Sequence, residues 1–179
     1  MLKMKRILIV ISALLITLAS HAQDRRPVFI GFSPQLTKEE FYDKGEFDLN
    51  IIPVVIQVPV TRRIDFRLST LGNFRFGGKS KFSDLGFNLS APVYFKRKDS
   101  IKQKSEGLFI SPYLGLSRNV LDKHNTYNMA GQVGYFFLMG ETFGMSMHVE
   151  YGSTLFIHDE LAKEWGPHFG FKVNLGWWF

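Results

Sequence analysis

The chain has 179 residues, of which 22 are Lys or Arg, 16 are Asp or Glu and none is Cys. This length fits a single domain, and the lack of Cys excludes both a disulfide framework and a thiolate site. After the first 22 residues no stretch approaches roughly 18 consecutive apolar residues, so a helical membrane protein is not expected.

Residues 1–22 have the three parts of a cleaved secretory signal peptide. Met1–Arg6 carries three basic residues, Ile7–Leu18 is apolar, and Ala19–Ala22 places small residues before a cut at Gln23. The apolar run is shorter than the roughly 20 residues that a membrane-spanning helix needs. Without this leader the chain keeps 19 basic and 16 acidic residues, so its net charge falls from +6 to +3. We therefore expect no nucleic-acid partner.

Eight segments of the remaining chain alternate apolar and polar residues with the period of two that is typical of β-strands. Pro53 and Pro59 interrupt the second segment. Because proline cannot donate to a strand ladder, we expect a bulge or an early strand end there. The predicted strands are 28–35, 47–58, 62–76, 82–95, 107–118, 127–139, 142–153 and 167–179.

The clearest alternation lies at the C-terminus, in His168–Phe179. One face of this strand is apolar. The opposite face is small or polar except for Trp178, which we expect at the rim. Six of the predicted strands have an apolar face that contains no ionisable residue at all. The apolar face of the last strand consists of Phe169, Phe171, Val173, Leu175, Trp177 and Phe179.

The apolar faces are predicted to point outward. Their Phe, Leu, Met, Val and Tyr side chains would overfill the interior of an eight-stranded barrel, which is just wide enough to be filled by side chains. A charge on a lipid-facing position costs about 2–4 kcal/mol near the bilayer centre, which explains why such faces would lack ionisable residues. The predicted fold over residues 23–179 is an all-β, eight-stranded antiparallel up-and-down transmembrane β-barrel. The alternative fold is a soluble periplasmic β-barrel that binds an apolar ligand.

The lengths of the connections agree with this topology in five of seven cases. Bacterial barrels have short turns on the periplasmic side, where both termini lie, and longer loops outside. Pro59–Thr61 and Gly140–Glu141 are short, as expected of periplasmic turns. Gly77–Lys81 is short for an outer loop, and Lys96–Glu106 is long for a periplasmic turn.

In architecture the chain resembles the small eight-stranded outer-membrane barrels of the OmpX and OmpA-barrel type. Its last strand is similar to the signal that the barrel-assembly machinery reads in such proteins. This resemblance implies an outer-membrane location and transit through that machinery. The residues that match the assembly signal are Phe171, Val173, Leu175, Trp177 and Phe179.

The inward faces carry ionisable residues of both signs, which we interpret as a polar network that fills the lumen, because buried charges must be paired. A hydrolytic set drawn from Ser146, His148, Glu150 and His168 is the sharper alternative. Spacing of two along a strand places such groups some 7 Å apart, so no catalytic, metal or cofactor site is predicted. The predicted lumen residues are Arg63, Asp65, Arg67, Arg75, Asp84, His148, Glu150, His168 and Lys172.

Two further segments are candidates for surface contacts. Phe156–Trp165 is predicted as an outer loop with an amphipathic stretch that could meet lipopolysaccharide or a partner. The basic run Lys96–Lys104 is predicted as a solvated periplasmic turn, with contact to anionic lipid as a lesser possibility.

We therefore expect a monomeric outer-membrane barrel with a structural or surface-interaction role and a lumen plugged by side chains, not an open pore. Its expected partners are outer-membrane lipids, lipopolysaccharide and, during biogenesis, the barrel-assembly machinery. No cofactor is expected. The alternative function is an outer-membrane enzyme that modifies lipid, although the catalytic His and Ser of the lipid A deacylases have no counterpart on the lipid-facing surface.

Overall fold

The computed structural model describes residues 27–37, 44–77, 81–97, 104–158 and 163–179 as a sheet of eleven strands. The predicted signal peptide, residues 1–22, lies outside the described residues. The strands are β1 (Phe29–Phe32), β2 (Leu36–Thr37), β3 (Phe47–Asn50), β4 (Val54–Pro59), β5 (Asp65–Phe76), β6 (Lys81–Ser90), β7 (Val93–Tyr94), β8 (Gly107–Asn119), β9 (His124–Met139), β10 (Phe143–His158) and β11 (Lys163–Trp178).

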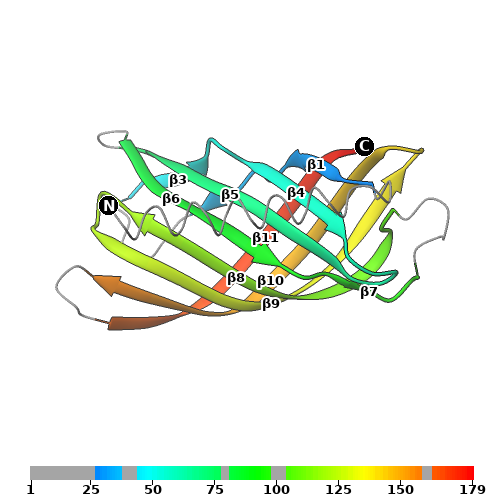
Figure 1. Ribbon diagram of the computed structural model, residues 1–179. Helices are drawn as coiled ribbons and strands as arrows, with labels where there is room; N and C mark the ends of the chain where they lie inside the picture. The colour runs from blue at the N-terminus through cyan, green and yellow to red at the C-terminus, as the bar shows by residue number, and fades with distance from the viewer. Residues whose placement is uncertain (1–26, 38–43, 78–80, 98–103, 159–162) are drawn as a thin grey trace, which may run out of the picture.

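These eleven segments form the eight strands of one closed antiparallel barrel (Figure 1). We call each of the eight, whether continuous or broken, a wall. β1 and β2 are successive pieces of the first wall, and they pair with β4 and β3, the two pieces of the second. Both pieces of the second wall pair with β5, and both β6 and β7 pair with β8. The pairing of β1 with β11 closes the sheet, with Phe29 opposite Trp178. The predicted eight-stranded antiparallel β-barrel is confirmed.

Proline residues interrupt the walls that are broken. β3 ends at Asn50 and β4 begins at Val54, on either side of Pro53. Pro92 stands between β6 and β7 in the same way. Since proline has no N–H to donate, each of these residues removes one hydrogen bond from the ladder, although Pro112 in β8 and Pro167 in β11 lie within unbroken strands. The strand end that Pro53 predicts is therefore confirmed.

The last walls are longer than the sequence pattern predicts. β9 begins at His124, β10 continues to His158 and β11 already begins at Lys163. The predicted outer loop around Phe156–Trp165 is thus wrong at both ends: Leu155 pairs with Trp165, and Ile157 with Lys163. Residues 159–162 of that stretch lie outside the described residues. Cross-strand pairing between neighbours extends the ladder through residues whose own composition resembles a loop.

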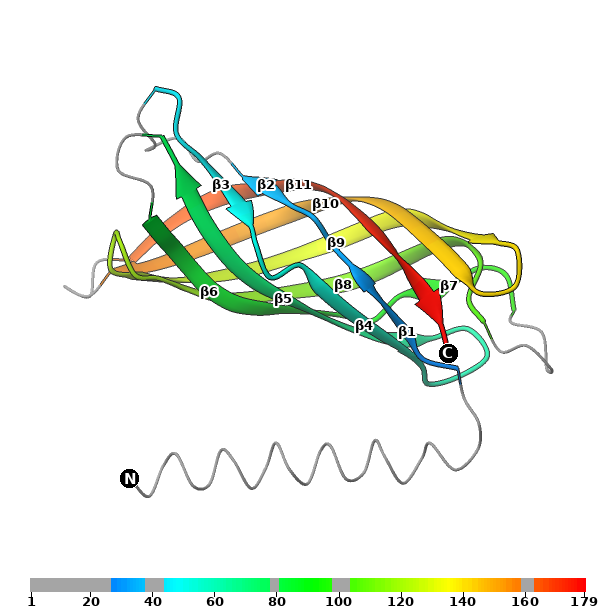
Figure 2. The same ribbon diagram turned by 90° about the horizontal axis from the view of Figure 1, so that it is seen from above.

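β1 begins and β11 ends at the same end of the barrel, which we call the terminal end; the other is the distal end (Figure 2). At the terminal end the backbone N–H of Val28 donates to Phe179 O at 3.0 Å, and that of Phe179 donates to Val28 O at 2.9 Å. The turn between β9 and β10 lies there as well. It is tight because Gly140 adopts a φ of 68°, which glycine reaches at little cost.

The barrel wall separates an apolar outside from a polar inside. β8 shows this most plainly, because its residues alternate between buried and exposed from Gly107 to Leu116. Phe171 and Trp177 on β11 are exposed, whereas Lys172 and Asn174 between them are buried. The apolar faces point outward, as the volume argument predicts.

A cluster of buried aromatic side chains, which we call the aromatic plug, lies inside the barrel at the terminal end. Trp178, expected at the rim, is instead only 2 % exposed and points inward. Its ring centroid lies 5.5 Å from that of Phe29 and 5.8 Å from that of Phe136. The plug consists of Phe29, Tyr94, Phe109, Phe136 and Trp178.

Candidate functional site in the barrel lumen

Most of the ionisable residues predicted to face inward are buried inside the barrel. His168 is also directed inward, although its side chain keeps 15 % of its exposure. The barrel wall places them on one surface because inward positions recur at every second residue of each strand. The buried residues of this set are Asp65, Arg67, Arg75, Asp84, His148, Glu150 and Lys172.

Arg63 is the exception, and its predicted place in the lumen is wrong. β5 begins at Asp65, so Arg63 belongs to the turn after β4, where it is exposed. The backbone carbonyl of Arg63 accepts a hydrogen bond from Tyr94 N at 2.7 Å, which fixes the turn. Once the strand has ended, the inside–outside alternation no longer determines where a side chain points.

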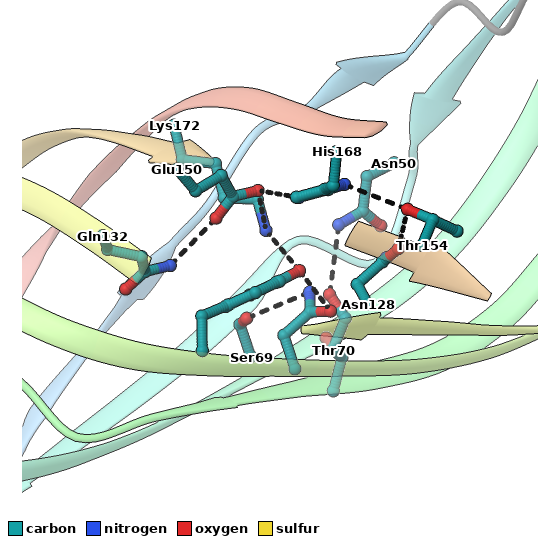
Figure 3. A network of polar contacts seen from close by, with 11 residues as sticks. Asn50, Ser69, Thr70, Asn128, Gln132, Glu150, Thr154, His168 and Lys172 are labelled. Atoms are coloured by element: carbon teal, nitrogen blue, oxygen red, sulfur yellow. Dashed lines mark hydrogen bonds and ion pairs between the residues drawn. The ribbon is translucent and has the colours of Figure 1, made fainter. Parts of the chain in front are cut away.

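Glu150 is the centre of a network in the middle of the lumen (Figure 3). Its Oε1 lies 3.1 Å from Lys172 Nζ and 3.1 Å from His168 Nε2. Its Oε2 accepts a hydrogen bond from Gln132 Nε2 at 2.9 Å. Both carboxylate oxygens therefore have partners, which compensates for the loss of water around a buried charge.

Lys172 links this carboxylate to Tyr113 on β8, across the lumen. Its Nζ donates to Tyr113 Oη at 2.8 Å and lies 4.3 Å from the centroid of the same ring. Tyr113 Oη donates in turn to Asn88 Oδ1 at 2.8 Å. The chain of bonds runs from β11 through β8 to β6, so it joins walls that are not neighbours in the sheet and crosses the lumen.

His168 continues the network toward the distal end. Its ring stacks on Tyr113 at 5.9 Å between centroids, and its Nδ1 lies 3.5 Å from Thr154 Oγ1. Thr154 donates to Asn128 Oδ1 at 2.6 Å. The hydroxyl proton of Thr154 is thus already committed to an amide and is not directed at the histidine.

A second polar cluster lies beside the aromatic plug. Gln57 Nε2 donates to Asp65 Oδ2 and, at 3.0 Å, to Tyr94 Oη. Gln57 Oε1 accepts from Arg67 Nε at 2.8 Å, and the Arg67 guanidinium lies 5.2 Å from the ring centroid of Phe109. The cluster holds one carboxylate and one guanidinium, which neutralise each other in charge.

A third cluster lies toward the distal end. Arg75 Nε is 3.3 Å from Asp48 Oδ1, and its Nη2 is 3.0 Å from Asp122 Oδ2. Asp48 also accepts a hydrogen bond from Ser83 at 3.0 Å. Opposite Asn73 and Phe74 the strand register shifts, and at this irregularity both Ser83 and Asp84 are buried.

The hydrolytic set that the sequence suggested is not assembled. Ser146 Oγ accepts a hydrogen bond from Asn174 at 2.8 Å, and His148 Nδ1 has no hydrogen-bond partner among the described residues. Glu150 binds Lys172, Gln132 and His168. Among the residues that the structure describes, no group of three or more His, Asp or Glu side chains could hold a metal ion.

Sequence reasoning missed the uncharged partners that complete the network. Tyr113, Gln132 and Gln57 are each buried and hydrogen-bonded to an ionisable residue. Each lies at an inward position of its strand, so position along the alternation was the available signal. A prediction of the lumen residues from charge alone does not include them.

No protein-family model matches the chain, and no curated protein matches it. Within the described ranges there is also no helix long and apolar enough to cross a membrane.

Proposed function

We propose that the chain is an outer-membrane β-barrel with a structural or surface-interaction role and a lumen closed by side chains. One observation carries the proposal: the barrel is apolar outside and ionic inside. The exposed ionisable side chains within the described strands are those of Lys81, His158, Lys163 and Glu164, and all four lie at the distal end. Between the strand ends the outer surface is a band of large apolar groups.

This distribution supports lipid as the surroundings of the barrel. A monomeric protein in water rarely exposes an apolar patch larger than a few hundred Å². In lipid such a band is favourable, and backbone polar groups must be paired, as the closed ladder allows. The soluble alternative needs an apolar lumen for its ligand, whereas this lumen contains the ion pairs of Glu150 with Lys172 and of Arg75 with Asp48, and a buried Arg67 that donates to Gln57.

Two features support a closed interior. The aromatic plug lies inside the terminal end, and the bonds from Glu150 through Lys172 to Tyr113 cross the middle. The proposal contains no enzymatic step, because Ser146 and His148 are not hydrogen-bonded to each other or to a carboxylate.

Biogenesis through the barrel-assembly machinery is part of the same proposal, as is the resemblance to the OmpX and OmpA-barrel type. The side chains of Phe171 and Trp177 on β11 and of Phe179 directly after it are exposed. A row of this kind is available to a receptor before the barrel closes. The signal peptide predicted for residues 1–22 is consistent with export.

The first test is location and compactness. We expect the full-length chain, expressed in a Gram-negative host, to fractionate with the outer membrane. In SDS the unboiled protein is expected to run as a compact band that shifts after boiling, because the closed ladder resists the detergent. Recovery of the native protein in the soluble periplasmic fraction would contradict the proposal.

The second test is conductance. Purified protein in planar bilayers is expected to give no large, stable single-channel currents, since eight walls leave an interior that side chains fill. A preparation of a general porin in the same bilayer provides the positive control. Large, reproducible currents from the purified chain would show that the plug and network do not close the lumen.

A further inference from the structure

An open depression with arginine residues lies on the outside of the barrel at the terminal end. It is formed where the turn after β4 meets the segment after β7, since Ile64 forms a bridge with Val93. Ile64 and Val93 are both partly exposed and belong to the outer apolar face. The residues that line the depression are Thr61, Arg62, Arg63, Ile64, Val93 and Arg97.

The turn that presents two of these arginines is held in one conformation. Thr61 Oγ1 accepts from the backbone N–H of Ile64 at 3.0 Å and from that of Arg63 at 3.2 Å. Val60 N and Thr61 N both donate to Ile64 O at 2.9 Å. A turn with this many internal bonds holds its backbone in one conformation before any ligand arrives, so binding does not have to order the turn.

The depression carries positive charge and no carboxylate. Arg62, Arg63 and Arg97 are exposed, and none of them forms an ion pair with another described residue. The neighbouring Lys96 differs in this respect, because its Nζ lies 2.7 Å from Glu106 Oε2. Three guanidinium groups around an apolar floor match a ligand that is anionic at one end and apolar at the other.

From this arrangement we propose that the depression binds the head group of an anionic phospholipid in the membrane leaflet at the terminal end. The phosphodiester contacts the guanidinium groups of Arg62, Arg63 and Arg97. An acyl chain lies over Ile64 and Val93 and continues along the outer face. The inference rests on the proposed function, because only a barrel embedded in a membrane places this depression at the level of the head groups.

The continuity of the apolar floor supports a lipid over a free anion. Val93 pairs with Ile110 on β8, which is 47 % exposed on the same outer face. A bound acyl chain would therefore remain in contact with apolar side chains from the depression into the band. A soluble phosphate would use the arginines and leave this floor in water.

The test is native mass spectrometry of the folded full-length protein in detergent micelles. Dioleoylphosphatidylglycerol is the anionic probe and dioleoylphosphatidylcholine the zwitterionic one. We expect the wild-type protein to bind the anionic lipid at least about tenfold more tightly, since each basic residue near a lipid surface contributes a factor of about five. The triple variant Arg62→Gln/Arg63→Gln/Arg97→Gln is expected to lose this preference.

A matched variant removes the same number of charges at the distal end: Lys44→Gln/Lys81→Gln/Lys163→Gln. It is expected to bind the anionic lipid as the wild-type protein does. Equal binding by the two triple variants would overturn the inference. So would complete displacement of the lipid by excess inorganic phosphate, because the site would then be a simple anion site.

The boiling shift in SDS is measured on the same samples, which separates this inference from the proposed function. A wild-type protein that shifts on boiling but binds the two lipids equally refutes the lipid site alone. A protein that shows no shift and enters no vesicle refutes the membrane barrel, and the lipid site is refuted with it.

Discussion

Replacing Glu150 by glutamine is expected to lower the free energy of unfolding by about 3–5 kcal/mol, the cost of leaving one partner of a buried ion pair alone. In the wild-type protein Glu150 Oε1 lies 3.1 Å from Lys172 Nζ, and the side chain of Glu150 is fully buried. The variant keeps the shape of the side chain and removes its charge. Lys172 then remains inside the barrel without an anionic partner. Denaturant unfolding in vesicles of fixed composition, followed by Trp fluorescence, measures the difference.

Two further variants control for this result. The double variant Glu150→Gln/Lys172→Met removes both charges, and we expect it to regain most of the lost stability, since an apolar replacement of a buried pair is often neutral. Glu164→Gln changes a side chain that is 74 % exposed, so its effect is expected to stay within about 0.5 kcal/mol. A double variant less stable than Glu150→Gln would contradict the pairing of these charges.

The second large effect is expected on the outer face, from Val149→Arg. Val149 lies near the middle of β10, is 46 % exposed and stands between Val133 on β9 and Phe171 on β11. In a bilayer the arginine is expected to cost about 2–4 kcal/mol, because its charge would lie near the membrane centre. In water the same change at an exposed position would cost within about 0.5 kcal/mol.

The matched control is Met139→Arg, at the last position of β9 near the terminal end. Met139 is 45 % exposed, so the two side chains have nearly the same exposed fraction and differ in their expected depth in the membrane. A charge close to the membrane surface is expected to cost only about 0–1 kcal/mol. Equal, small losses for both variants in vesicles would indicate that the outer face does not meet lipid.

The wall of the barrel could be predicted from the sequence because strand alternation is a local property. Successive side chains of a strand point to opposite faces of the sheet. The order of apolar and polar residues in the sequence therefore predicts which residues face outward and which face inward. Pro53 marks a strand end for an equally local reason, the missing N–H. The number of walls and the outward apolar face followed from these signals and from the small volume inside eight strands.

The partners inside the lumen could not be predicted in this way. Lys172 meets Tyr113, and Gln57 meets Tyr94, across 59 and 37 residues of sequence. Which side chains reach each other depends on the tilt and stagger of the walls, which only the closed sheet determines. Ser146 and His148 share a face of β10. In the folded barrel, however, Ser146 accepts a hydrogen bond from Asn174, and His148 Nδ1 has no hydrogen-bond partner among the described residues.

By itself, the sequence determined the eight-walled barrel and the side of each wall that faces in. Only the tertiary structure decided that Trp178 belongs to an interior aromatic plug and that Arg63 lies outside at a turn. The physical reason is the same in both cases. Alternation assigns a side chain to a face while the strand lasts, whereas the place where a strand ends, and what fills the space across the barrel, depend on residues far away in the chain.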